Sequence, residues 1–410
     1  MSILEVNCDN LQNNPKCAHG PTLKFSRLVK GRVKRFFACS ACRDRKDCPF
    51  FLWEDEPISD SKLLSWAEVR NKSISSIDHD SLQKRLKIFK NLDCQNRKFC
   101  LSCFDFVLKN EENVHKLHII KNNITNDVLL HPSLLIAPST KNKKEAQFWF
   151  SDNSKQFIVN NIINLNTESV LCIGAPTIYE QLRNKNFKSL LLDIDYRFHW
   201  FYDSQEFCWF NMFNCHFFSE EESSKQLLLQ NLQFSNIIVV IDPPFGARIE
   251  PLKKTIETFQ SLTASRIQII LILPYFMEPQ ILTSFPDFKI LDYPIEYLNH
   301  NKFNGKVHNT LKKSSPVRIF TNIPPKNFIF PKHGYYFCNI CEAWRSVANT
   351  HCSFCETCPS KNGDVYNHCF VCKKCFKKTW IHCNKCKRCC LSEHACEENE
   401  RNSFKKKRRK

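Results

Sequence analysis

The sequence predicts an α/β core with small zinc-binding modules before and after it. The middle of the 410-residue chain alternates apolar, β-type runs with helical or loop segments, which is typical of an α/β sheet. The 24 cysteines lie mainly outside this middle: 8 precede residue 119, 3 lie between 119 and 337, and 13 lie in 338–396. At roughly 100–200 residues per domain, this length suggests two to four folded units.

Charge and cysteine chemistry narrow the class of protein. Lys and Arg number 59 against 41 Asp and Glu, so the formal net charge is +18, which favours an anionic partner such as nucleic acid. No apolar run approaches the ~18 residues that cross a bilayer. Residues 1–14 are polar and carry no signal-peptide pattern, so we expect no membrane partner. Most cysteines stand in C-x2-C units beside histidines, which favours zinc over disulfides.

The first module is expected at residues 15–56. Its candidate zinc ligands are Cys17, His19, Cys39 and Cys48, and Cys42 is a fifth candidate. Basic and aromatic residues alternate around them, a mixture that suits backbone charge contacts and base stacking. These residues are Arg35, Phe36, Phe37, Arg43, Arg45 and Lys46. The segment resembles the GRF zinc finger, a small β module that binds single-stranded nucleic acid; the alternative is a purely structural zinc.

The second module is expected at residues 92–122 as a C2H2-type finger. Its ligands would be Cys100, Cys103, His115 and His118, although two residues between the histidines is a shorter gap than usual. The segment 104–108 that follows the second cysteine is apolar and acidic rather than basic. We therefore expect this finger to dock on a neighbouring domain rather than to enter a nucleic-acid groove.

Seven apolar runs within residues 128–330 predict the strands of the central sheet. They are 169–173, 189–194, 213–218, 237–241, 267–273, 288–297 and 317–321. Between the last two runs only the polar, Lys-rich segment 299–316 intervenes, with no long helix. This predicts an antiparallel pair at the sheet edge.

The run 237–241 ends in Asp242, Pro243, Pro244 and Phe245. Ligands of open α/β sheets bind at such carboxyl ends of strands. The prolines withhold N–H donors, so the Asp242 carboxylate and nearby carbonyls present acceptors, while Phe245 presents a ring face. An amino group on a flat π system, such as adenine, matches these groups. The alternative is an ordinary Pro-Pro turn.

Two further strand ends predict a nucleoside-bearing cofactor. The run from 189 leads to Asp193 and Asp195, where an acid can accept both ribose hydroxyls. Gly174 follows the run 169–173 in a tight turn, but the full G-x-G-x-x-G pattern is absent. A cofactor without a pyrophosphate is therefore favoured.

This order of glycine turn, acidic strand end and Asp-Pro-Pro-Phe resembles the class I (Rossmann-like) S-adenosylmethionine-dependent methyltransferases that act on amino groups. Together with the zinc modules, the chain resembles the zinc-finger CCHC-domain-containing ribosomal RNA N6-adenosine methyltransferases. The resemblance implies methyl transfer from S-adenosyl-L-methionine to N6 of an adenosine in large-subunit ribosomal RNA. No side chain is an obvious general base, and in-line attack by the amine would rely on positioning and electrostatics.

The resemblance also implies site residues. Those of the cofactor site would be Gln147, Phe148, Trp149, Phe150, Gly174, Thr177, Asp195, Asn211, Met212, Phe213 and Asp242. The catalytic segment that holds the base would be Asp242, Pro243, Pro244 and Phe245. Residues 302–316 correspond to a family loop that can cover the active site.

The C-terminal module, residues 335–397, offers sixteen ligands, which divide into four Cys3His sites and leave Cys390 over. We expect an interleaved ladder of four rungs: Cys338, Cys341, His351 and Cys358; Cys352, Cys355, His368 and Cys375; Cys369, Cys372, His382 and Cys389; Cys383, Cys386, His394 and Cys396. With the two N-terminal fingers, this predicts about six zinc ions. The first rungs resemble the cysteine-rich domain of membrane palmitoyltransferases, but the catalytic Asp and first His are replaced, so Cys369 is expected to be a ligand.

The basic tail, residues 398–410, is expected to be solvated. It suits a nuclear or nucleolar address and nonspecific attraction to RNA, and the cytoplasm is a further expected location. Large-subunit ribosomal RNA is the expected partner, with ribosome-assembly proteins as further candidates. Two other functions remain open: a protein lysine or glutamine N-methyltransferase, and a catalytically inactive zinc-based RNA-binding scaffold.

Overall fold

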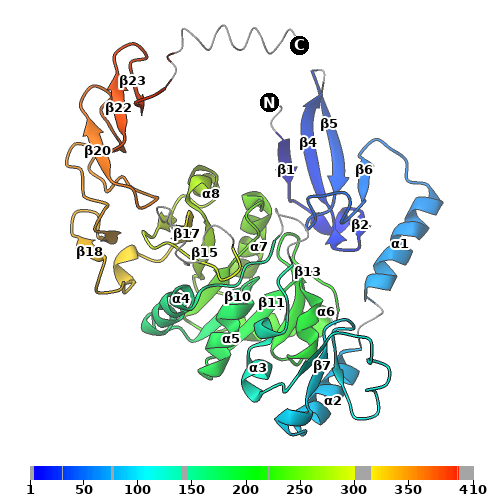
Figure 1. The fold of residues 1–410 in the computed structure, drawn as a ribbon. Coiled ribbons are helices and arrows are strands. Elements are labelled where there is room, and N and C mark those ends of the chain that lie inside the picture. Colours follow the sequence, from blue (N-terminus) through cyan, green and yellow to red (C-terminus); the bar gives the residue numbers. More distant parts are fainter. Residues whose placement is uncertain are drawn as a thin grey trace.

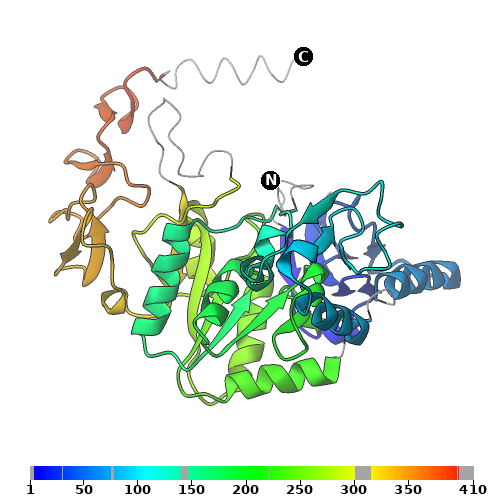
Figure 2. The same cartoon turned by 60° about the horizontal axis from the view of Figure 1, so that its bottom comes forward.

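The computed structural model describes residues 4–29, 31–74, 78–139, 146–219, 221–300, 315–394 and 396. One large α/β domain lies at the centre, with the N-terminal modules on one side and a narrow C-terminal arm on the other (Figures 1 and 2). Residues 302–314 of the expected active-site loop and the basic tail at 398–410 lie outside the described residues. In the described part of the chain, no helix is both long and apolar enough to cross a bilayer.

The central sheet has eight strands in the order β13-β12-β11-β10-β14-β15-β17-β16. Their bounds are β10 (Ser169–Ile173), β11 (Ser189–Asp193), β12 (Phe207–Asn211), β13 (His216–Phe217), β14 (Ile237–Ile241), β15 (Gln268–Pro274), β16 (Lys289–Ile290) and β17 (Val317–Thr321). Strands β12, β11, β10, β14 and β15 are parallel, whereas β17 is antiparallel to both β15 and β16. The predicted antiparallel pair at the edge is therefore confirmed.

Two of the predicted strands are wrong in extent. The third parallel strand is β12, and the predicted run 213–218 contains only the two-residue β13. Asn211 and Asn214 explain this, because their side-chain oxygens accept N–H groups two residues later and turn the chain. The predicted run 288–297 shrinks to β16, since Pro294 within it has no N–H for a continuous ladder.

Helices cover both faces of this sheet, as Figure 1 shows. They are α4 (Asp152–Asn164) and α5 (Pro176–Asn184) on one face, and α6 (Glu221–Leu232), α7 (Ile249–Ser261) and α8 (Glu278–Ser284) on the other. Each helix buries an apolar stripe against residues of the strands, so the sheet separates two hydrophobic cores. Strand β14 contains only Ile and Val, all buried, which suits a central strand covered on both faces.

The first N-terminal module is a four-stranded sheet with an adjoining hairpin. Its strands are β1 (Leu4–Asn7), β4 (Leu23–Val29), β5 (Arg32–Ala38) and β6 (Phe51–Trp53), and the hairpin pairs β2 (Lys16–Cys17) with β3 (Gly20–Pro21). Helix α1 (Asp60–Ile74) follows, and its Trp66 ring lies 4.2 Å from the ring of Phe50. This contact joins the helix to the small core around the cysteines.

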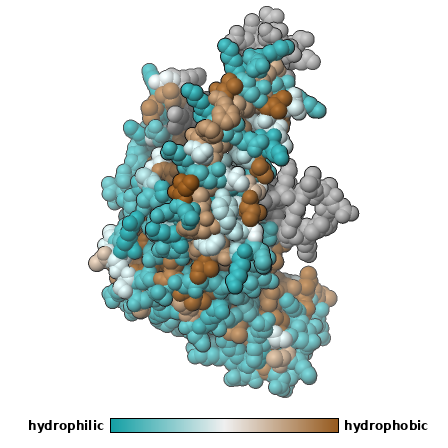
Figure 3. Space-filling model, turned by 90° about the vertical axis from the view of Figure 1, so that its left-hand side faces the viewer, coloured by the Kyte–Doolittle hydropathy of each residue, from teal (hydrophilic) through white to brown (hydrophobic). Residues whose placement is uncertain are grey.

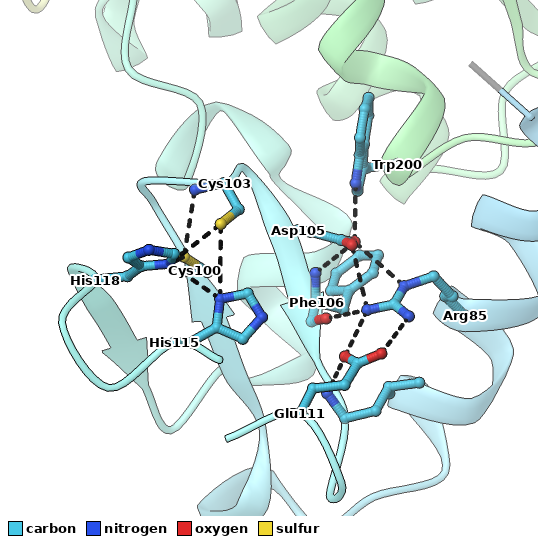
Figure 4. A network of polar contacts seen from close by, with 10 residues as sticks. Arg85, Cys100, Cys103, Asp105, Phe106, Glu111, His115, His118 and Trp200 are labelled. Carbon is cyan, nitrogen blue, oxygen red and sulfur yellow. Dashed lines mark hydrogen bonds and ion pairs between the residues drawn. The ribbon is translucent and has the colours of Figure 1, made fainter. Parts of the chain in front are cut away.

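The second module docks on the central domain, as its apolar and acidic segment predicted. It comprises α2 (His79–Lys90), β7 (Lys98–Cys100), β8 (Asp105–Val107), β9 (Ile120–Asn122) and α3 (Asn126–Leu130). Arg85 of α2 binds both carboxylate oxygens of Glu111 at 2.7 Å and contacts Asp105, which also accepts a hydrogen bond from Trp200 of the central domain at 3.1 Å (Figure 4). The half-buried Asp105 thus ties the finger to its neighbours by charge-assisted bonds.

The C-terminal arm consists of three hairpins that extend from the central domain (Figures 1 and 2). They are β18 (Tyr335–Cys338) with β19 (Ala343–Ser346), β20 (Tyr366–Cys369) with β21 (Lys374–Lys377), and β22 (Trp380–Cys383) with β23 (Arg388–Leu391). The first hairpin is fixed to the domain because buried Asp292 accepts hydrogen bonds from Ser346 N at 3.0 Å and from Asn349 Nδ2 at 2.8 Å.

Candidate active site

A cavity of about 700 Å³ opens at the carboxyl ends of the parallel strands. Residues from the sequence prediction that line it are Gln147, Phe148, Trp149, Gly174, Asp195, Asn211, Met212, Phe213, Asp242, Pro243, Pro244 and Phe245. Phe150 and Thr177 do not reach the cavity lining. Phe150 is buried behind it and stacks on Tyr297, with ring centroids 5.1 Å apart, and Thr177 is buried in the first turn of α5.

Gly174 lines the cavity at the turn between β10 and α5. Its φ of +64° is a conformation that residues with side chains rarely adopt. A Cβ atom there would lie 2.7 Å from Met212 Cε and 3.0 Å from the Asp242 carbonyl oxygen. The single glycine is therefore required both for the turn and for the close approach of the strand ends, even without a full glycine-rich motif.

Two acids lie at the carboxyl end of β11, Asp193 as its last residue and Asp195 just after it, and they have different partners. Asp195 is clamped by Arg197, with Nε–Oδ1 at 2.8 Å and Nη2–Oδ2 at 2.6 Å, and by Gln147 Nε2 at 3.0 Å. Asp193 also lines the cavity, and its Oδ1 accepts a hydrogen bond from the backbone N–H of Asp195 at 2.9 Å. Burial, reinforced by the neighbouring Asp195, raises the pKa of Asp193 to about 7.

This raised pKa makes the fold less stable as the pH rises. The normal pKa of the acid is 3.8 and its folded-state pKa is about 7. Its contribution to the free energy of unfolding is therefore fully present below pH 3.8 and is lost progressively as the pH rises to about 7. We expect Asp193→Asn to raise the free energy of unfolding at pH 8.5, by at most on the order of 4 kcal/mol. The gain over wild type should shrink at pH 5.5, as measured by calorimetry.

The matched control is Asp195→Asn. Because Asp195 holds an ion pair with Arg197, its substitution should lower stability at both pH values. A gain for Asp193→Asn that does not depend on pH would contradict the assigned cause.

Asp242 stands directly after β14 and faces the cavity. Its Oδ1 accepts a hydrogen bond from the hydroxyl of Tyr297 at 3.3 Å. Burial, together with repulsion from Asp193, raises the pKa of Asp242 well above its usual range, and the bond from Tyr297 opposes that rise. Tyr297 is not among the predicted site residues, because its partner lies 55 residues away and no local motif marks it.

Aromatic rings form the wall beside Asp242. Phe148 and Phe245 are stacked with centroids 5.4 Å apart and an interplanar angle of 23°. A base held between two rings needs roughly 7 Å, two contact distances. In this arrangement a base therefore stacks on an outer ring face, or one of the two rings moves aside.

The segment that carries Phe148 and Trp149 is held by Asn299, which binds Gln147 O at 2.9 Å and Trp149 N at 2.8 Å. The indole Nε1 of Trp149 is buried and has no hydrogen-bond partner among the residues that the structure describes. The acids at the end of β11, and the turn at Gly174 where a Cβ would lie 2.7 Å from Met212 Cε, fit S-adenosylmethionine, a cofactor with ribose hydroxyls and no phosphate.

The first zinc finger supplies another wall of the same cavity through His19, Ala41 and Cys42. The amide Nδ2 of Asn211 donates to His19 O and to Ser40 Oγ, both at 2.9 Å. Asn214 Nδ2 also donates to His19 O, at 3.0 Å. Asn211 thus anchors the finger to the strand end in addition to lining the cavity, a contact that no spacing in the sequence predicts.

The Cys and His residues gather into groups whose ligand atoms lie within 4.8 Å of one another. The five groups are Cys17, His19, Cys39 and Cys48; Cys100, Cys103, His115 and His118; Cys338, Cys341, His351 and Cys358; Cys352, Cys355, His368 and Cys375; and Cys369, Cys372, His382 and Cys389. In the remaining rung, His394 Nε2 lies 3.2 Å from Cys386 Sγ and 3.3 Å from Cys396 Sγ, which is itself 3.6 Å from Cys383 Sγ.

These donor sets fit tetrahedral zinc, which prefers thiolate and imidazole ligands. The structure thus brings together the residues of every rung that the spacing predicts. Cys42 lies 3.6 Å (Sγ) from His19 Nε2 and belongs to none of the five groups above, while Cys390 donates to the Arg388 carbonyl.

The sheet order, the glycine turn, the acids of β11 and the Asp-Pro-Pro-Phe segment in one cavity define a class I S-adenosylmethionine-dependent methyltransferase. Residues 141–323 match the family model of probable N6-adenine methyltransferases, and residues 15–57 match that of GRF zinc fingers. The rRNA N(6)-adenosine-methyltransferase ZCCHC4 of Xenopus tropicalis is 39% identical over 358 residues, which cover 82% of this chain and 73% of the relative. This chain belongs to the family of zinc-finger rRNA N6-adenosine methyltransferases that includes ZCCHC4.

Two further relatives show how far the similarity extends. ZCCHC4 of Homo sapiens is 40% identical over 360 residues, covering 82% of this chain and 70% of the relative. The EEF1A lysine methyltransferase 1 of Gallus gallus is 31% identical over 127 residues, covering 30% of this chain and 54% of the relative. The second match is therefore confined to a part of the chain, whereas the first takes in most of it.

Proposed function

We propose that this protein transfers the methyl group of S-adenosylmethionine to N6 of an adenosine in large-subunit ribosomal RNA. The observation that carries the proposal is the shared cavity of Asp242 to Phe245 with the acids of β11 and Gly174. The name of the ZCCHC4 relatives, rRNA N(6)-adenosine-methyltransferase, supports ribosomal RNA as the substrate. The basic, aromatic-bearing first zinc finger, which lines the cavity through His19, Ala41 and Cys42, suits a nucleic-acid substrate better than a small molecule.

Some residues of the cavity are placed to bind the cofactor and others to bind the adenine base. Asp193 and Asp195 are placed to bind the cofactor, which supplies an electrophilic methyl group when bound. Asp242 is placed to accept hydrogen bonds from the adenine amine, while Phe245 offers a stacking face. Tyr297 orients Asp242 through its hydroxyl. The chain therefore contributes orientation, water exclusion and a favourable charge distribution, the main sources of rate in a direct transfer.

We also propose a nuclear or nucleolar location for the protein and further protein partners there. The basic residues of 398–410 suit a nuclear or nucleolar address, the compartment in which ribosomal RNA is assembled into subunits. Ribosome-assembly proteins are proposed as further partners there. Fluorescence of the tagged full chain, compared with one that ends at residue 397, tests the address: equal distribution of the two would contradict it.

Methylation of ribosomal RNA that lacks the modification is the direct test. Pure, zinc-loaded protein is incubated with labelled S-adenosylmethionine, and the digested RNA is analysed by nucleoside mass spectrometry. We expect the label in N6-methyladenosine of large-subunit RNA. Label in protein instead of RNA would favour a lysine or glutamine methyltransferase, the alternative to which the partial match with the EEF1A lysine methyltransferase points. A chain that does not bind the cofactor would favour the inactive scaffold.

A further inference from the structure

Two segments of the cavity wall that lie far apart in the sequence are paired like the strands of a small sheet. Phe150 and Tyr297 form an antiparallel bridge. Next to this bridge, Leu298 N donates a hydrogen bond to the carbonyl of Trp149 at 2.7 Å. The pairing joins the segment that carries Phe148 to the segment that carries Tyr297, so it sets where these two rings stand relative to each other.

Asn299 continues this pairing with its side chain. Its Oδ1 accepts a hydrogen bond from Trp149 N at 2.8 Å, and its Nδ2 donates to the carbonyl of Gln147 at 2.9 Å. These groups belong to the two peptide units on either side of Phe148, so one side chain holds the backbone on both sides of that ring. A primary amide suits this position because it offers an acceptor and a donor side by side, as the backbone of a neighbouring strand does.

The rings of the two segments form one packed group beside Asp242. The centroid of Phe148 lies 5.4 Å from that of Phe245 and 5.5 Å from that of Tyr297. The hydroxyl of Tyr297 reaches Asp242 Oδ1 at 3.3 Å. The face of the molecule seen in Figure 3 exposes hydrophobic side chains among hydrophilic ones, whereas Phe150 and Tyr297 are each only 1% exposed. Because such interiors are close-packed, a shift of one of these rings displaces its neighbours.

We propose that Asn299 is a positioning residue for methyl transfer. By holding both peptide groups around Phe148, it keeps that ring beside Phe245 and keeps Tyr297 in register with Asp242. The inference rests on the proposed function and adds to it a residue that does not itself line the cavity. A misplacement of about 1 Å in a group that orients the substrate lowers the rate about 10²-fold, so two hydrogen bonds at this position can have a large effect on turnover.

The cofactor side of the same segment has restraints of its own. Gln147 Nε2 donates to Asp195 Oδ2 at 3.0 Å, but Arg197 also binds the two oxygens of that carboxylate, at 2.8 and 2.6 Å. Loss of the Asn299 bonds should therefore leave Asp195 in place. We expect the affinity for S-adenosylmethionine to stay the same and the effect to appear in the rate of transfer to the base.

Asn299→Ala, assayed at saturating cofactor with the RNA that the wild type methylates, tests the inference. We expect kcat to fall about tenfold to a hundredfold, with an unchanged calorimetric Kd for S-adenosylmethionine. The matched control is Asn322, which binds Ile269 N and Ile267 O, both at 2.8 Å, at the opposite edge of the central sheet. Asn322→Ala removes an equivalent pair of bonds, so it should lower the unfolding temperature as Asn299→Ala does while leaving kcat unchanged.

A double-mutant cycle shows whether Asn299 acts through Phe148. Phe148→Ala should itself lower kcat, and Asn299→Ala should cost much less in that background than in the wild type, because the ring that the amide holds is already absent. Asn299→Asp is a second variant that removes only one bond: it keeps the acceptor for Trp149 N and loses the donor to Gln147 O. Its kcat should also fall at unchanged cofactor affinity.

The outcomes separate this inference from the proposed function. Normal kcat in both Asn299 variants, or equal losses of kcat for Asn299→Ala in the two backgrounds, would overturn the positioning role while RNA methylation by the wild type still stood. Equal losses of kcat for Asn299→Ala and Asn322→Ala would assign the effect to stability alone and would overturn it as well. A wild type that methylates no RNA would contradict the proposed function and, with it, the inference.

Discussion

Replacing Asp242 by asparagine is expected to lower kcat for adenosine methylation by about 10²–10³-fold, the range seen when one preorganised polar contact to a reacting group is removed. The substitution keeps the shape of the side chain and an oxygen acceptor for the Tyr297 hydroxyl, which lies 3.3 Å from Oδ1. At a pH where Asp242 is ionised, the substitution also removes the negative charge that faces the amine as positive charge develops on nitrogen. Asp242→Ala, which also removes the acceptor, should abolish turnover.

The same substitution should stabilise the fold. Burial raises the pKa of Asp242 well above its usual range, so the ionised form is disfavoured in the folded state, and stability is lost as the pH rises through that raised pKa. Asparagine does not ionise, so the Asp242→Asn protein should not lose this stability as the pH rises. Its unfolding temperature at alkaline pH should therefore be higher than that of the wild type, while its activity falls. Opposite signs for activity and stability identify a residue retained for function.

Single-turnover kinetics and scanning calorimetry measure the two effects, and Asp287→Asn is the control. Asp287 pairs with Arg266 on the surface, where an exposed ion pair contributes little. Its substitution should change neither quantity appreciably. Near-normal kcat for Asp242→Ala would remove Asp242 from the site.

Short-range chemistry in the sequence predicts much of this site. The Asp-Pro-Pro-Phe segment, the acids at the end of β11 and Gly174 each follow buried apolar residues, and parallel strands necessarily bring their carboxyl ends to one edge. The zinc ligands are predictable for a similar reason, because C-x2-C pairs beside histidines can close tetrahedra only in a few ways.

Contacts between distant segments could not be predicted in this way. The third strand was misplaced because Asn211 and Asn214 turn the chain, and both also bind the carbonyl of His19, nearly two hundred residues away. Tyr297 reaches Asp242 from an irregular segment after β16 that resembles a strand in composition. Such side-chain bonds depend on how separate modules dock, which neither spacing nor hydrophobic period encodes.

Loss of the zinc in the first finger is expected to reduce cofactor affinity, whereas loss of a zinc in the arm is not. Structural zinc contributes roughly 10–16 kcal/mol to the folding of isolated zinc-finger peptides, so Cys39→Ser should unfold the two loops that carry His19 and Cys42. Both residues line the cofactor cavity, and the His19 carbonyl holds Asn211 at 2.9 Å. We expect binding of S-adenosylmethionine to weaken at least tenfold, as the cavity loses a wall.

Cys369→Ser provides the matched control, because it removes a ligand of the same chemistry from the third rung of the arm. No residue of that rung lines the cavity, so cofactor affinity should stay at its wild-type value in calorimetric titrations. Elemental analysis should give about six zinc ions for the wild type, two from the fingers and four from the ladder, and a lower count for each variant. Three or fewer ions in the wild type would contradict the ladder. Unchanged cofactor affinity in a Cys39→Ser protein that has lost its finger zinc would show that the catalytic domain forms the cofactor site alone.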